Sequence, residues 1–184
     1  YLAGNPLRAA RTRATRPRQQ TAHRYLGQES WQFVLEHLES WPRATAREVA
    51  HYQRTKFLIS FLYLTGLRRS EIAQASTADL VQRRGQWWLH VSGKGHTGLP
   101  VPVAQDALQA LQTYRISLGR SPWPNPHQPE PLLMDLYGKG RQLTSKAVQQ
   151  IVTALFDSAA KACPDPEQAR LLQSVTTHWL RHTT

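Results

Sequence analysis

Cysteine is nearly absent from this chain of 184 residues, which contains only Cys163. A single thiol cannot form an internal disulfide, and it excludes a zinc site built from several cysteines. The sequence also lacks the carboxylate clusters and Cys/His spacings that hold metal ions, so we expect no metal or other cofactor. No apolar run approaches the roughly 18 residues that span a bilayer, and no apolar signal core follows the basic N-terminus. We therefore expect a cytoplasmic protein with no membrane partner.

Acidic residues are scarce as well. The chain has 12 Asp and Glu against 23 Lys and Arg, which gives a net charge of +11. Eighteen of the basic residues are arginines, whose planar guanidinium group matches the oxygens of a phosphate. This balance favours a polyanionic partner, and nucleic acid over a membrane surface. A genome rich in arginine codons is the alternative explanation for the charge.

Residues 1–28 contain no acid at all and show little apolar periodicity. With Pro6 and Pro17, this composition predicts an extended arm or interdomain linker that lies along a phosphate backbone and releases counterions. The candidate DNA-backbone contacts in it are Arg8, Arg11, Arg13, Arg16, Arg18 and Arg24. A disordered linker with no part in binding is an equally good interpretation.

Apolar periodicity predicts a mainly α-helical domain with a small antiparallel β-sheet, an α+β class, over residues 29–184. The expected helices cover residues 29–40, 45–66, 104–118 and 144–162. Thr45 and Glu48 form a T-x-x-E capping box at the start of the second, and Thr144 caps the fourth. The helix over 104–118 is amphipathic, with Leu108, Leu111, Ile116 and Leu118 among the apolar positions of its inner face. Asp165 and Pro166 are the expected N-cap and first position of a further, shorter helix. Alternation predicts a strand over 86–92, a turn at 93–96 and a return strand to 103 that Pro100 and Pro102 confine to a sheet edge. Residues 121–131 hold five prolines and predict an irregular loop, whose role stays open, as does that of residues 163–172.

The basic residues that stand out each have an ordinary structural interpretation. Arg68 could form an ion pair with Glu71, one helical turn later. Lys94 lies between two glycines at the predicted turn, a usual place for a solubilising charge. His178 and Arg181 are three residues apart and share a helical face, which alone is typical of an exposed polar surface.

The order of these motifs is more specific than any one of them. T-G-L-R-R-S-E at residues 65–71, S-G-K-G at 92–95 and T-T-H-W-L-R-H-T at 176–183 resemble the tyrosine recombinases, the phage-integrase and Xer-like family of site-specific DNA recombinases. The resemblance covers nearly the whole chain, because YLAGNP at its start is similar to the family's linker into the catalytic domain.

The resemblance implies a role for each of these residues. Arg68 and Arg181 would bind the non-bridging oxygens of the scissile phosphate, and Lys94 would protonate the departing 5′ oxygen. His178 would exchange a proton with the tyrosine nucleophile and bind the phosphate. Glu71 would support this arrangement, and His182 would lie behind it or be structural.

The resemblance also implies a substrate and an assembly. The partner is double-stranded DNA, cut through a 3′-phosphotyrosine intermediate without a metal, and the intact protein works as a tetramer on DNA. Family members carry the nucleophile after H-x-x-R, whereas every tyrosine of this chain precedes His178. We therefore expect an inactive, monomeric fragment that lacks its nucleophile segment, the alternative being a naturally complete inactive protein. A non-catalytic DNA-binding remnant or regulator and a type IB topoisomerase relative are the other functions to consider.

Overall fold

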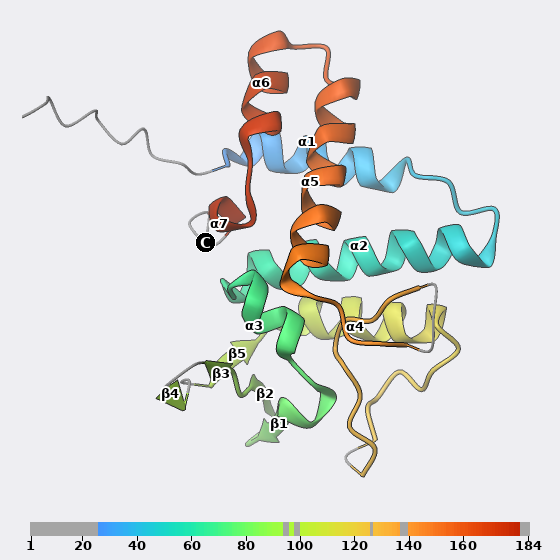
Figure 1. Ribbon diagram of the computed structural model, residues 1–184, viewed down its shortest axis with the longest axis vertical. Helices are drawn as coiled ribbons and strands as arrows, with labels where there is room; N and C mark the ends of the chain where they lie inside the picture. The colour runs from blue at the N-terminus through green and yellow to red at the C-terminus, as the bar shows by residue number, and fades with distance from the viewer. Residues whose placement is uncertain (1–25, 94–95, 98–99, 126, 137–139, 181–184) are drawn as a thin grey trace, which may run out of the picture.

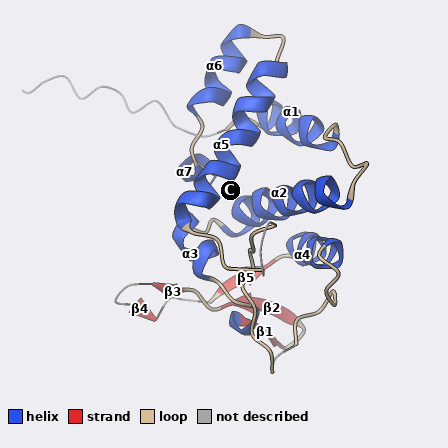
Figure 2. Ribbon diagram, turned by 45° about the vertical axis from the view of Figure 1, so that its right-hand side comes forward, coloured by secondary structure: helices blue, strands red, loops and turns tan. Residues whose placement is uncertain are grey.

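Seven α-helices, one short 3-10 helix (Thr77–Asp79) and five short strands form the regular structure in the part of the chain that this computed structural model describes, residues 26–93, 96–97, 100–125, 127–136 and 140–180 (Figure 1). The helices are α1 (Gln28–Glu39), α2 (Ala46–Thr65), α3 (Arg69–Gln74), α4 (Gln105–Ser117), α5 (Ser145–Ala162), α6 (Pro166–Ser174) and α7 (Thr177–Leu180). The strands are β1 (Leu80–Arg83), β2 (Gln86–Leu89), β3 (Ser92–Gly93), β4 (His96–Thr97) and β5 (Val101–Val103). The strands gather at one end of the molecule and the helices form the rest (Figure 2), which confirms the predicted α+β class.

Helix α2 is the centre of the hydrophobic core. Its start is the predicted capping box, in which the Thr45 hydroxyl accepts from the Glu48 N–H at 3.2 Å and the Glu48 carboxylate accepts from the Thr45 N–H at 2.9 Å. Most of its second half is buried, including Phe57, Phe61 and Leu62, because α4, α5 and β5 pack against it, whereas Leu64 near its end is 36% exposed. The helix ends at Gly66, whose φ of 62° is the left-handed conformation that favours glycine.

The three-stranded sheet has the order β1-β2-β5 and is antiparallel throughout. β5 is an edge strand, as Pro102 required, since proline has no N–H to donate to a further strand. The predicted strand over residues 86–92 is too long, because β2 ends at Leu89 and the chain then leaves the sheet. Ser92 and Thr97 pair in a separate ribbon, β3–β4, so the predicted turn does not join β2 directly to its return strand. β1 was not predicted at all.

One predicted core position on α4 is wrong. Ile116 is 58% exposed, although the apolar pattern placed it on the inner face. The inner face instead carries Tyr114 and Arg115, both buried. Because successive helical residues are rotated by about 100°, turning this pair inward leaves Ile116 in solvent.

The proline-rich loop 121–131 is irregular, as predicted, but it is anchored to its surroundings. Glu130 accepts hydrogen bonds from the guanidinium groups of Arg115 and Arg120. Trp123 stacks on Trp87 of β2 with ring centroids 5.2 Å apart. The loop therefore covers part of the sheet.

The C-terminal helices pack onto the rest through α5. Thr144 caps α5 by accepting from the Ala147 N–H at 3.1 Å, and Asp165 caps α6 just before Pro166, both as predicted. α5 contacts α1, α2, α3 and α6, whereas α7 contacts α2. In both views α3, α7 and the β3–β4 ribbon lie along one side of the molecule (Figures 1 and 2). No helix in the described ranges has the length and hydropathy needed to cross a membrane.

Candidate functional site

Arg68 occupies the N-terminal cap of α3, two residues after the left-handed Gly66 that ends α2. The intervening Leu67 is 3% exposed and anchors this short segment in the core. Arg68 itself has extended backbone, with φ −73° and ψ 150°, and 65% of its side chain is exposed. The sequence Gly-Leu-Arg thus ends one helix, inserts an anchor and projects a cation outward at the start of the next.

Glu71 holds Arg68 in place with both carboxylate oxygens. One oxygen accepts from the Arg68 backbone N–H at 2.7 Å, and the other accepts from its Nη1 at 2.9 Å. The ion pair expected from the sequence is therefore confirmed. At such an exposed arginine it contributes less than about 1 kcal/mol to stability. The main effect of the ion pair is to orient the guanidinium group. The Nε and Nη2 of Arg68 make no hydrogen bond to any described residue.

A second contact joins the start of α3 to the start of α7. Arg69 donates from Nη1 to Oε1 of Gln149 on α5 at 2.9 Å, and the Thr177 hydroxyl donates to the same oxygen, also at 2.9 Å. Thr177 is the residue before His178 in α7. Neither periodicity nor any motif singles out Gln149, because its partners lie 80 and 28 residues away in the chain.

The structure describes only part of the predicted set of site residues. Glu71 and Arg68 are fully described and in contact, while His178 is placed only by its backbone, in α7. The ribbon that brackets Lys94 is formed by β3 and β4, and β3 contacts α3. Segments from all three sequence motifs thus converge around α3. Outside the described residues lie Lys94, Arg181, His182, Arg8, Arg11, Arg13, Arg16, Arg18 and Arg24.

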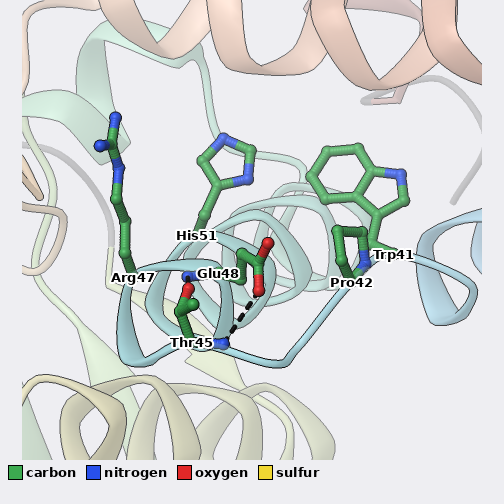
Figure 3. A pocket seen from close by; sticks show the side chains of 6 residues that line it. All are labelled: Trp41, Pro42, Thr45, Arg47, Glu48 and His51. Atoms are coloured by element: carbon green, nitrogen blue, oxygen red, sulfur yellow. Dashed lines mark hydrogen bonds between the residues drawn. The ribbon is translucent and has the colours of Figure 1, made fainter.

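A pocket of about 320 Å³ lies elsewhere, at the turn between α1 and α2 (Figure 3). Trp41 and His51 both line it, and their rings stack on each other with centroids 5.2 Å apart. Burial, followed by the charges of Arg54 and Arg47, lowers the pKa of His51. The Glu48 carboxylate at its edge is already used in the cap of α2. None of the predicted site residues lines this pocket.

Metal ligands are also not gathered anywhere in the described ranges, where no group of three or more His, Cys, Asp or Glu side chains is arranged to hold an ion. Around α3 the described donors of Arg69 and Thr177 are already bonded to Gln149, whereas the exposed Arg68 uses only its backbone N–H and Nη1 on Glu71 and keeps its other guanidinium donors for a further acceptor. Such donors are suited to binding an anion with tetrahedral oxygens.

Comparisons with known proteins point the same way. The profile of the phage integrase family matches residues 36–184. A tyrosine recombinase of Synechococcus elongatus is 30% identical over 137 residues, covering 74% of this chain and 39% of that protein. The tyrosine recombinase XerC of Lacticaseibacillus casei is 30% identical over 131 residues, covering 71% and 40%. The chain thus spans about two fifths of the length of the curated relatives it matches.

The fold is similar to that of a solved recombinase. A crystal structure of the XerH site-specific recombinase bound to difH substrate, in a pre-cleavage complex, matches 86% of this chain and 40% of that one. The TM-score is 0.59 and the sequence identity 21%. A post-cleavage complex of XerH on a palindromic difH substrate gives a TM-score of 0.60.

Proposed function

Since this chain belongs to the phage integrase family, we propose that it is the phosphate-binding part of the catalytic domain of a site-specific tyrosine recombinase, which cleaves and rejoins double-stranded DNA. The observation that carries the proposal is the exposed Arg68, oriented by Glu71 beside α7 and the β3–β4 ribbon. This geometry leaves the Nε and Nη2 donors of Arg68 without a hydrogen bond to any described residue and available to a phosphate.

The proposed chemistry is a transesterification at phosphorus. The oxygen of a tyrosine, which in the family follows the H-x-x-R motif, attacks the phosphorus as the bond to the 5′ oxygen breaks. Arg68 and Arg181 stabilise the added charge of the five-coordinate transition state, because charge-assisted hydrogen bonds to phosphate strengthen as charge develops. Lys94 gives a proton to the leaving 5′ oxygen, and His178 takes the proton of the tyrosine. The ester stores the bond energy, so the reverse reaction needs no other energy source.

The wider charge distribution supports a DNA partner. The net charge of +11 attracts a polyanion over a long range. The arginines of residues 1–28 would then follow the backbone outside the site, a role that stays part of the proposal. We also propose a cytoplasmic location, and a tetramer on DNA as the assembly of the whole protein.

The test is binding of a fluorescent 30-base-pair duplex, followed by anisotropy at several salt concentrations. Arg68→Ala should weaken binding about tenfold and reduce the slope of log Kd against log salt by about 0.9, the value of one lost phosphate contact. Arg170→Ala removes the same charge from an exposed position on α6, away from α3, and should change Kd less than about twofold. Equal effects of the two substitutions, or binding that does not depend on salt, would contradict the proposal.

A further inference from the structure

Gln149 is the point where the two predicted phosphate-binding segments meet. Its Oε1 accepts from Arg69 and from Thr177, each at 2.9 Å, and its Nε2 donates to the Thr153 hydroxyl at 3.1 Å. All three lengths lie in the ordinary range for strong hydrogen bonds. One amide thus connects α3, α5 and α7.

The orientation of this amide is fixed by chemistry. A guanidinium group has only donors, so Arg69 can contact the amide oxygen but not the amide nitrogen. With the oxygen facing Arg69, the nitrogen points along α5 to Thr153. Thr177 is 8% exposed, so its hydroxyl has little access to water if Gln149 is removed. The contact is therefore both directional and costly to break.

We propose that Gln149 is a positioning residue that sets the separation between Arg68 and His178, an inference that rests on the proposed function. Arg69 directly follows Arg68, and Thr177 directly precedes the His178 backbone. Both partners are the first residues of their helices, so restraining them restrains where each helix starts and which way it points. Two groups that bind one phosphate together must keep such a spacing.

A neutral side chain suits this place better than a charged one. A carboxylate at position 149 would also accept from Arg69 and Thr177. It would add a negative charge between two segments that bind a phosphate, and like charges repel at this range. The amide supplies the same acceptor without that repulsion.

The experiment compares DNA binding by matched variants of the 184-residue protein, well below their melting temperatures. Gln149→Met keeps the length of the side chain but removes all three hydrogen bonds of the amide, and should weaken binding about fivefold, the scale of one net hydrogen bond. Gln150→Met makes the same change at the next, exposed position of α5 and should leave Kd within about 1.5-fold. Thr177→Val should weaken binding about threefold. Thr177→Ser keeps the hydroxyl and should bind DNA as tightly as the unsubstituted protein.

A second measurement separates positioning from general loss of structure. Combining Gln149→Met with Arg68→Ala should weaken binding no more than Arg68→Ala alone, because positioning acts through Arg68. If the double variant instead loses affinity by the product of the two single fold-changes, the inference is wrong. Equal affinity of Gln149→Met and Gln150→Met would also overturn it. If Arg68→Ala weakens binding and Gln149→Met does not, only the positioning role fails. If Arg68→Ala has no effect, the proposed function fails and the positioning role fails with it.

Discussion

Glu130 should be one of the most important charged residues for stability in the described part of the chain. Its carboxylate binds Arg120 and also Arg115, whose Nη1 lies 3.1 Å away. The Arg115 side chain is only 5% exposed, and burial, followed by the charge of Arg120, lowers its pKa. Without Glu130, the guanidinium group would keep the Ser121 carbonyl, 2.8 Å from Nε, as a partner but no counter-charge.

The expected loss can be estimated from this environment. Removing one partner of a fully buried ion pair costs about 3–5 kcal/mol. The Glu130 side chain is 26% exposed and Arg115 retains one hydrogen bond, so we expect Glu130→Ala to cost about 2–3 kcal/mol. For a protein of this size that corresponds to a fall in melting temperature of about 5–10 °C. Urea unfolding followed by circular dichroism gives the free energy directly.

Two further variants decide whether the reasoning holds. Glu36→Ala removes an exposed carboxylate from α1 and should change stability by less than about 0.5 kcal/mol. Adding Arg115→Met to Glu130→Ala removes the unpaired buried charge and should recover about 1 kcal/mol or more. A Glu130→Ala protein as stable as Glu36→Ala would refute the account.

Two other predictions concern the packing of α1 and of the proline-rich loop. Burial lowers the pKa of His37, which lies 2.8 Å from the Ser158 hydroxyl, below its ordinary 6.5. The unfolded state therefore binds the proton more tightly, and stability should fall as pH drops below about 6.5. His37→Gln should reduce the difference in melting temperature between pH 8 and pH 5.5, and an unchanged difference would contradict this reasoning. Trp123→Ala removes the stack on Trp87 and should lower the free energy of unfolding in urea by about 1 kcal/mol. DNA affinity should not change, and a loss of affinity would indicate that the loop contacts DNA.

The features that the sequence predicted correctly depend on neighbours a few residues away. The caps at Thr45 and Asp165 are hydrogen bonds to backbone groups two or three residues on, so their partners are fixed by spacing. The same holds for the ion pair of Arg68 with Glu71. Proline at 102 likewise restricts its own strand, whatever lies beside it.

The features that were missed or wrong depend on distant partners. β1 exists only because it pairs with β2, and its four residues carry no alternation of their own. Ile116 is exposed because Glu130, beyond the helix, holds Arg115 inward. Gln149 could not be found for the same reason, since a glutamine on a helix is ordinary until the fold brings its two donors together.

The bridge made by Gln149 also has a consequence for the order of events in folding. Its donors lie 80 residues before it and 28 after it, so the contact closes two loops whose entropy must be overcome before it forms. Contacts of this range form late, after local helices have already appeared. A chain that has folded only as far as α3 and α4 therefore displays Arg68 without α7 beside it. The proposed site is therefore complete only once α5 and α7 have packed onto the earlier part of the chain.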